Sequence, residues 1–246
     1  MWRGYTISVV LPTYNEKDSI RSSIHEFEGT GYVDEIVVVN NNAAPGTSEE
    51  VAHTSAREVH EPQQGYGFAC RRGLREARGD FIVLSEPDGT FRGSDVLKLL
   101  AYADNADLVL GSRTAKGFIW RDANMGFFLR WGNWAVAKLL EVLFNTTNLT
   151  DVGCTMRLIR RQALLEIQDE FTIGGSHFGP QMILATLKHN LRVIQIPVNY
   201  QQRVGKSMAT GSKAKATAIG LRMIALILRY RLELWLSRQP EKQADR

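Results

Sequence analysis

Short runs of β-branched residues alternate with segments of helical spacing over residues 1–110. The runs predict strands at residues 7–11, 35–39, 56–60, 80–85 and 107–110, with Pro12 ending the first. The spacing predicts helices at residues 18–27, 48–54, 67–77 and 94–103, the last with Ser94 as its N-cap. Such alternation favours an α/β fold with a mostly parallel sheet and right-handed crossovers.

The pattern changes after residue 120. Residues 124–144 are apolar and rich in aromatic side chains, residues 192–198 predict another strand, and residues 213–236 predict a long helix. We therefore divide the chain into an α/β domain at residues 1–205 and a basic amphipathic helical segment at residues 206–246.

Polar residues follow four of the predicted strands, at positions 13–16, 40–42, 86–88 and 112–113. Ligands of parallel sheets bind beyond the carboxyl ends of the strands. Four polar clusters at one edge therefore predict the functional site there.

Composition narrows the picture only slightly. The chain is 44% hydrophobic and 23% charged, as expected for a globular protein with a sizeable core. A net charge of +4 leaves nucleic acid, anionic lipid and nucleotide open as partners. Cys70 and Cys154 lack metal-like spacing, which favours two ordinary thiols in a reducing compartment. The chain has no run of 18 apolar residues and starts without a signal-peptide pattern, so we expect no bilayer span.

Glu86 and Asp88 are two carboxylates separated by one residue, beside Gly89 at a strand end. Such a pair can hold Mg²⁺ or Mn²⁺ against a diphosphate, with water completing the coordination. Taken alone, the pair is more often a solvated acidic turn. Its place after a buried strand is what favours a metal site.

Two further clusters suit a nucleotide. Tyr14 could stack on a base, and Glu16 could bond a base or ribose edge, although a capped loop explains both equally well. Gly67 begins a predicted helix, and a helix N-terminus suits a phosphate or a sugar hydroxyl. An ordinary turn is the alternative for that glycine.

The segments ISVVLPTYNE, EIVVVNNN, QGYGFACRRGLREARGDFIVLSEPDG and LVLGSR, in this order, resemble the inverting family 2 glycosyltransferases, which have the GT-A fold. The resemblance covers residues 6–205 and implies a metal at Glu86 and Asp88, with Asp88 catalytic. It implies a nucleotide-sugar donor bound by Pro12, Tyr14, Glu16, Asn40, Asn41, Gly67, Glu86, Pro87 and Asp88. The chain departs from the family at two places. Asparagines stand at 40–42, where the family usually has an Asp, and Glu86 stands at the first metal position, where the family also usually has an Asp.

Within that family, the chain is most similar to polyprenyl-phosphate glycosyltransferases of the dolichyl-phosphate mannose synthase type. The likeness rests on GSR at 111–113, LRWGN at 129–133, LTDVGCTMRL at 149–158 and RVGKS at 203–207. It implies an acceptor phosphate bound by Arg113, Arg130, Asn133, Arg203 and Lys206. Arginine offers planar bidentate donors and a permanent charge to a phosphate, whereas each arginine taken singly would more often make a surface ion pair.

Asp151 and His177 are the candidates for a base. A phosphate acceptor needs none, because its second pKa lies near about 6 and its oxygen is already a nucleophile at neutral pH. We therefore expect Asp151 to position or polarise the reactants. For His177, a place in a glycine-rich loop on the acceptor side is an equal alternative.

A basic stripe of Lys215, Arg222 and Arg229 predicts that the last helix lies on anionic lipid. Its opposite side is apolar, through Ile219, Met223, Leu226, Ile227 and Leu234. A second, aromatic contact could come from Phe127, Phe128, Trp131 and Trp134. The alternative is that these helices pack on the core or on a partner chain.

These features together predict inverting transfer of a hexosyl group from a nucleotide-sugar to a polyprenyl phosphate, by a peripheral enzyme on the cytoplasmic face of a membrane. One rival is transfer to a sugar or protein hydroxyl, which would require Asp151 as a true base. Another is a catalytically silent nucleotide-sugar-binding protein. Nucleic-acid binding is disfavoured because the basic residues are spread and no known module is present.

Overall fold

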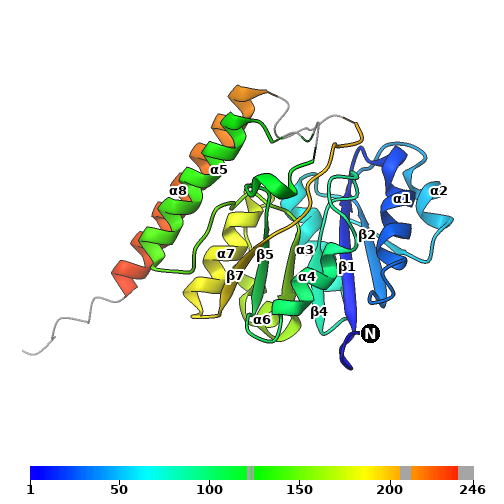
Figure 1. Ribbon diagram of the computed structural model, residues 1–246, viewed down its shortest axis with the longest axis horizontal. Helices are drawn as coiled ribbons and strands as arrows, with labels where there is room; N and C mark the ends of the chain where they lie inside the picture. Colours follow the sequence, from blue (N-terminus) through cyan, green and yellow to red (C-terminus); the bar gives the residue numbers. More distant parts are fainter. Residues whose placement is uncertain (121–122, 124, 206–211, 238–246) are drawn as a thin grey trace, which may run out of the picture.

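The computed structural model describes residues 1–120, 123, 125–205 and 212–237, which form an α/β structure around a central sheet (Figure 1). Lys206, one of the predicted phosphate ligands, lies outside the described residues.

The sheet has seven strands in the order β3-β2-β1-β4-β6-β5-β7. They are β1 (Ile7–Thr13), β2 (Glu35–Asn40), β3 (Arg57–His60), β4 (Phe81–Leu84), β5 (Leu108–Ser112), β6 (Arg157–Arg160) and β7 (Val193–Pro197). β6 pairs antiparallel with β4 and β5, and the other pairings are parallel. The mostly parallel α/β sheet expected from the sequence is confirmed, with one reversed strand that the hydrophobic pattern did not predict.

Helices cover both faces of the sheet. One face carries α1 (Lys17–Glu28) and α4 (Asp95–Tyr102), with α2 (Thr47–Ala52) beside α1. The other carries α3 (Tyr66–Glu76), α6 (Arg161–Ile167) and α7 (Phe178–Lys188), with α5 (Phe127–Phe144) and α8 (Lys213–Ser237) forming an outer pair. Short 3₁₀ turns occur at Lys116–Phe118 and Gln168–Glu170. Each apolar face of the sheet is thereby covered by amphipathic helices.

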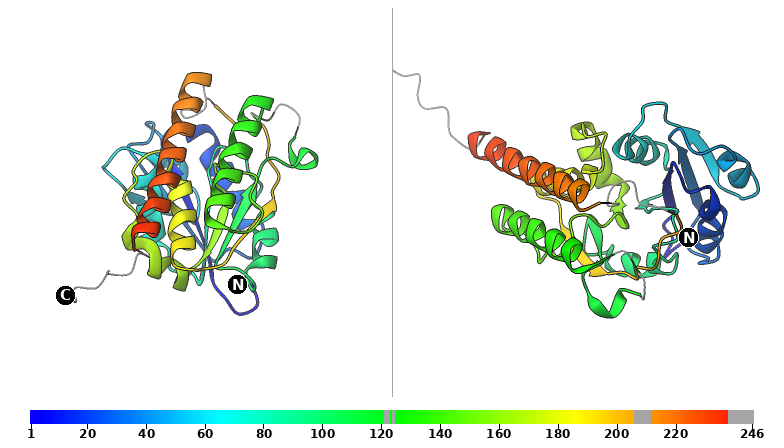
Figure 2. Two further views of the ribbon diagram at one scale, coloured as in Figure 1. Left: turned by 90° about the vertical axis from the view of Figure 1, so that its left-hand side faces the viewer. Right: turned by 90° about the horizontal axis from the view of Figure 1, so that it is seen from above.

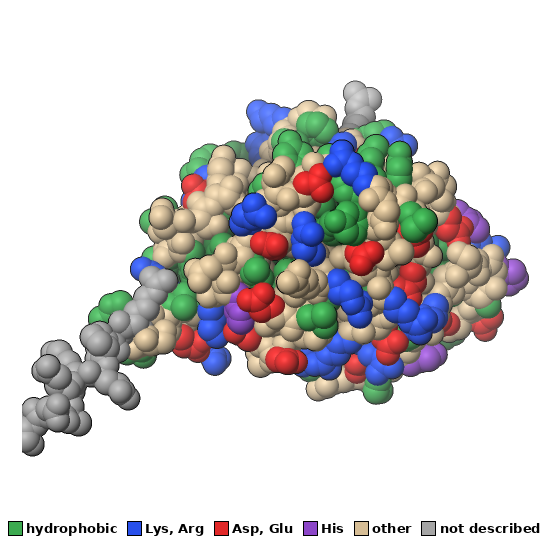
Figure 3. Space-filling view, turned by 90° about the horizontal axis from the view of Figure 1, so that it is seen from below, with side chains coloured by type: hydrophobic (Ala, Val, Ile, Leu, Met, Phe, Trp, Pro, Cys, Tyr) green, Lys and Arg blue, Asp and Glu red, His purple; other side chains and the backbone are tan. Residues whose placement is uncertain are grey.

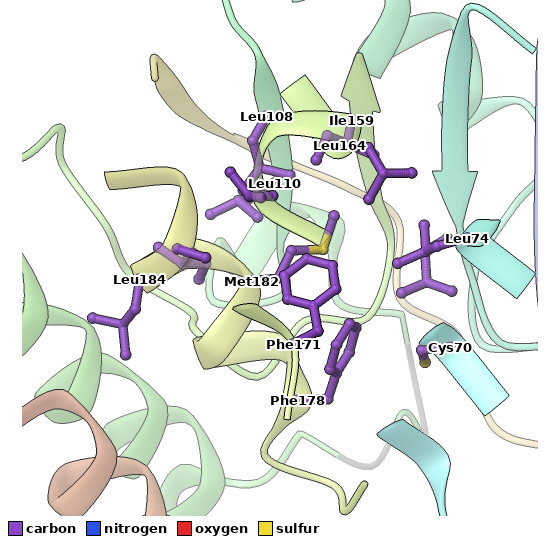
Figure 4. Packing of buried hydrophobic residues seen from close by; sticks show 14 of the residues in the cluster. Cys70, Leu74, Leu108, Leu110, Ile159, Leu164, Phe171, Phe178, Met182 and Leu184 are labelled. Carbon is purple, nitrogen blue, oxygen red and sulfur yellow. The ribbon is translucent and has the colours of Figure 1, made fainter. Parts of the chain in front are cut away.

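The core between the sheet and α7 is tightly packed (Figure 4). Phe171 and Phe178 meet edge to face at 5.1 Å between ring centroids, and Met182 lies beside them. Cys70 is buried at the edge of this cluster as a free thiol, consistent with the expected reduced cysteines.

The first strand runs through Pro12 to Thr13, so the prediction that Pro12 ends it is wrong. The carbonyl of Val10 accepts from Ser85 N, so the backbone of Val10 faces the β4 side of the strand. Backbone groups of every second residue in a strand face the same side, so the nitrogen of Pro12 also faces β4. β4 has already ended there, since its last pair with β1 is Val10 with Leu84. The missing N–H of proline therefore breaks no hydrogen bond.

Ser94 stands at the N-cap position of α4, as predicted, but its side chain makes no capping hydrogen bond. Residues 129–133 lie in the first two turns of α5. Arg130 and Asn133 are therefore helical residues whose directions are set by α5.

The predicted apolar side of α8 faces the protein. Met223 and Ile227 are buried in the main core, and α8 packs against α5 and α7, as the views of Figure 2 show. The packing alternative therefore holds for this side. The outward side carries Lys215, Arg222 and Arg229 together with exposed Leu221 and Leu228.

In the described part of the chain, no helix combines the length and apolar character that crossing a bilayer requires. On the face seen from below, at the amino ends of the parallel strands, basic and acidic side chains are interleaved (Figure 3).

Candidate active site

The site lies at the sheet edge where the parallel strands end, at the top of Figure 1. Glu16 follows β1, Glu86 and Asp88 follow β4, and Arg113 follows β5. Asp151 reaches the same edge because β6 runs antiparallel and therefore begins where its neighbours end. These predicted groups therefore lie at one edge of the sheet, beyond the carboxyl ends of the parallel strands.

Asp88 is fully buried, which is unusual for a carboxylate. Its Oδ1 accepts hydrogen bonds from the backbone N and the hydroxyl of Thr90, at 2.9 and 2.5 Å. Its Oδ2 lies 2.6 Å from Arg203 Nη1 but has no hydrogen bond of acceptable geometry. Gly89, at φ +77°, allows the tight turn that brings Thr90 back to Asp88.

Arg203 lies among three carboxylates. Its guanidinium is 2.8 Å from Glu16, 3.4 Å from Glu86 and 2.6 Å from Asp88. We expected Arg203 beside an acceptor phosphate, together with Arg113 and Arg130. The structure instead pairs each of Arg203 and Arg113 with its own carboxylates, and the acceptor role of these arginines remains a prediction.

Burial and the charge of Asp88 raise the pKa of Glu86 to about 8, with Arg203 opposing them. A positive charge near Glu86 would favour its ionised form.

The loop after β1 is organised by Glu16 itself. Its Oε2 accepts from the backbone N of Tyr14 and of Asn15, at 2.7 and 2.9 Å. Its Oε1 pairs with Arg203. The capped-loop alternative therefore describes Glu16 well, while Tyr14 is exposed and available for stacking.

Arg113 and Asp151 form a buried, two-point ion pair. Arg113 Nε and Nη2 donate to the two oxygens of Asp151, at 2.8 and 3.0 Å, and Asp151 also accepts from the backbone N of Arg113 and of Gly153. Burial raises the pKa of Asp151, but Arg113 and these bonds outweigh it and leave the pKa below its ordinary value. A carboxylate of lowered pKa that is saturated with donors is a poor general base.

Arg130 lies on α5 and lines a cavity of about 560 Å³ with Trp131 and Trp134. Ser112, Thr114 and Thr150 form a hydroxyl cluster on the wall of this cavity, with contacts of 2.8 Å. Asn133, also on α5, points its amide back to Leu129 O, and its side chain flanks Gly153 together with Arg113.

The side chains of Asn40 and Asn41 are engaged within the protein. Asn40 donates to Ser48 and Glu58, and Asn41 donates to the carbonyls of Glu61 and Gln63. Gly65 N donates to Asn41 Oδ1. These amides organise the loops around the site, and base recognition by them would require these bonds to break.

Gly67 is also occupied. Its N–H donates to Gly174 O, and a Cβ at this position would lie 2.3 Å from Ile173 O. The glycine is thus required for close packing of the 173–175 loop on α3, and its amide is not free for a ligand. The carbonyl of Pro87 likewise accepts from Ser19 Oγ at 2.7 Å.

His177 lies at the start of α7, where burial and then the charge of Arg222 lower its pKa. The residues described by the structure contain no group of three or more His, Cys, Asp or Glu side chains that could hold a metal. A cation at Glu86 and Asp88 would therefore need oxygen ligands from substrate or water.

Tyr200 and Thr90 also lie at the site, and no sequence pattern predicted them. The ring of Tyr200 lies under Arg113, 5.3 Å from the guanidinium carbon to the centroid, and burial raises the pKa of its hydroxyl. Both residues fall in irregular segments that no periodicity marks. In the sequence, Thr90 lies two residues after Glu86-Pro87-Asp88 and Tyr200 three residues before Arg203. This closeness in the sequence was the signal that could have pointed to them.

Residues 8–168, well over half of the chain, match the sequence profile of Glycosyl transferase family 2. The chain belongs to glycosyl transferase family 2. The predicted glycosyltransferase is thereby confirmed at the level of the family.

Two curated relatives of this family 2 glycosyltransferase come from Haloferax volcanii. The low-salt glycan biosynthesis hexosyltransferase Agl6 is 28% identical over 82% of the chain, which spans only about half of that relative, 49%. The dolichyl-phosphate hexose transferase is 27% identical, over 93% of the chain and 96% of the relative.

Among solved structures, the glucosyl-3-phosphoglycerate synthase of Mycobacterium tuberculosis superposes with a TM-score of 0.73 at 20% identity. The match covers 93% of this chain and 80% of that one. It was crystallised with Mn²⁺, UDP-glucose and phosphoglyceric acid. At this identity the match concerns the fold, and the predicted GT-A fold is confirmed.

Proposed function

We propose that this glycosyltransferase transfers a hexosyl group, with inversion, from a nucleotide-sugar to a polyprenyl phosphate at the cytoplasmic surface of a membrane. Residues 1–205 would carry the reaction, and residues 206–246 would assist contact with the membrane.

Glu86 and Asp88 are the residues that would hold a divalent cation. Carboxylate oxygens are the ligands that Mg²⁺ and Mn²⁺ prefer, and Asp88 Oδ2 is a buried oxygen without a hydrogen bond. When bound, the cation would offset the charge that develops on the leaving diphosphate. Tyr14, whose backbone N–H donates to Glu16, is exposed and suits a base that stacks on it.

The engagement of Asp151 with Arg113 is the observation that carries the choice of acceptor. A hydroxyl acceptor needs a base, and Asp151 has a lowered pKa and donors on both oxygens. A phosphate acceptor needs only a cationic site, which Arg113 and Arg130 can provide. The printed name of the Haloferax relative, a dolichyl-phosphate hexose transferase, supports the same acceptor class.

Membrane contact is supported by the outward sides of α5 and α8. Phe127 is 71% exposed and Trp131 50%, which is unusual for large apolar side chains. On α8, exposed Leu228 and Trp235 lie on the same helix as the basic Arg222 and Arg229. Apolar residues beside basic ones suit a surface of anionic lipid.

The test is a panel of nucleotide-sugars, each offered with a short polyprenyl phosphate and Mn²⁺, with products identified by mass spectrometry. Matched reactions would replace the acceptor with the free polyprenol, a simple sugar or 3-phosphoglycerate. Transfer only to the polyprenyl phosphate is expected. Equal transfer to the free polyprenol would refute the phosphate assignment, and donor binding without transfer or hydrolysis would favour the silent binder.

A further inference from the structure

Arg203 lies against the two carboxylates that would hold a cation. Three carboxylates, from the ends of two different strands, converge on its guanidinium at 2.6–3.4 Å. Two of them, Glu86 and Asp88, are the residues that would hold the metal. The side chain of Arg203 is only 20% exposed, so the charge is held largely out of water.

The backbone fixes Arg203 at this place. Gln201 N donates to Thr90 O at 2.8 Å, and Val204 N donates to Asp88 O at 2.9 Å. These two bonds tie residues 201–204 to the turn that contains Asp88. The guanidinium is therefore delivered to the carboxylates by the chain itself, whatever the side chain at position 203.

A guanidinium and a divalent cation against the same Asp88 oxygen repel each other, because both are positively charged. Arginine is permanently charged, so it cannot relieve this repulsion by losing a proton. Its Nη1 lies against Oδ2, the Asp88 oxygen that Thr90 does not bind and that has no hydrogen bond of acceptable geometry. A cation at Oδ2 would therefore compete with the guanidinium for this oxygen.

We propose that Arg203 is a positioning residue whose guanidinium compensates Glu86 and Asp88 when no cation is bound, and that it is displaced when the cation binds. The displaced guanidinium, still tethered by residues 201 and 204, is then free for an anionic group of the substrates. This inference rests on the proposed metal role of Glu86 and Asp88.

The experiment measures Mn²⁺ binding to the intact protein by electron paramagnetic resonance, without sugar or acceptor. Arg203→Met and Arg203→Gln remove the competing charge and should bind Mn²⁺ on the order of tenfold tighter than wild type, or more, because a unit charge within a few ångströms is removed. Arg203→Lys should fall between. Arg75→Met, the same charge change at an exposed arginine of α3, should bind like wild type.

Thermal unfolding with and without Mn²⁺ supplies a second readout. If Arg203 formed a merely structural ion pair, its removal would not change the rise in melting temperature that Mn²⁺ causes. Without metal, Arg203→Met leaves the carboxylates uncompensated and should melt below wild type. Saturating Mn²⁺ should raise its melting temperature by more than it raises that of wild type, because binding to the folded state stabilises it.

Equal or weaker Mn²⁺ affinity in both neutral variants would overturn the inference. So would a variant that melts early and gains no more from Mn²⁺ than wild type does. Failure of the proposed metal role looks different: no variant would bind Mn²⁺, and transfer would continue in chelator.

Discussion

The buried pair of Arg113 and Asp151 gives the clearest quantitative prediction. Asp151 is fully buried and the Arg113 side chain is 13% exposed, with two hydrogen bonds between them. Asp151→Asn would leave the Arg113 charge without its partner. Breaking one partner of such a pair costs about 3–5 kcal/mol, and the slight exposure of Arg113 favours the lower end, about 3 kcal/mol.

The matched variants are Arg113→Met and the double variant. The backbone N–H groups of Arg113 and Gly153 bind different oxygens of Asp151, and the single amide oxygen of Asn keeps an acceptor for one of them. The double variant therefore lacks both charges while retaining one of the two backbone hydrogen bonds. It should be less destabilised than the sum of the single variants, by about 2 kcal/mol or more. Each kcal/mol corresponds to about 2–4 °C in melting temperature for a chain of this size, so Asp151→Asn should melt roughly 6–12 °C early.

The assay is urea and thermal unfolding followed by circular dichroism. The folded-state pKa of Asp151 is lowered, so the contribution of this pair is present above about pH 4 and is lost as the pH falls through the folded value. Asp151→Asn should therefore flatten the acid side of the stability profile. Single-variant effects that simply add would refute the coupled pair.

Turnover of the same variant separates the two acceptor classes. With a phosphate acceptor, Asp151→Asn assayed well below its melting temperature should be slowed but still active. Loss of all turnover in a folded variant would make Asp151 a true base and favour a hydroxyl acceptor.

Three further outcomes are expected. Chelator should abolish transfer, and full activity in chelator would exclude the metal role. Asp88→Ala should lower turnover by orders of magnitude, whereas the exposed control Asp104→Ala should not. Arg130→Ala should lower kcat/KM for the acceptor about 10–100-fold, the loss of roughly 1.5–3 kcal/mol of charge-assisted bonding, with lysine restoring only part; unchanged acceptor kinetics would remove Arg130 from the site. Intact protein should float with anionic liposomes, and less so in high salt. The double variant Trp131→Ser/Trp235→Ser should weaken flotation, whereas Leu97→Ser on α4 should not. Equal flotation of the double variant and the Leu97→Ser control would place the lipid contact elsewhere.

The alternation of strands and helices, and the edge at which the site lies, could be predicted from the sequence. Runs such as residues 36–39 are apolar throughout because both faces of a parallel strand are covered by helices. Since parallel strands end at one edge, Glu16, Glu86 and Arg113 could be placed together from their positions after these runs. Motif order then identified the family.

Only the tertiary structure decided how these residues are paired. β6 is four residues long, and its insertion between β4 and β5 depends on distant partners, so no local pattern predicts that it brings Asp151 to the site. Arg203 and Glu16 are 187 residues apart in the chain, and their ion pair follows from the backbone ties at residues 201 and 204. The apolar side of α8 was readable as a stripe, but whether it meets lipid or protein depends on α5 and α7, which cover it. Periodicity records which residues avoid water, whereas the choice of partner is made by the geometry of the folded chain.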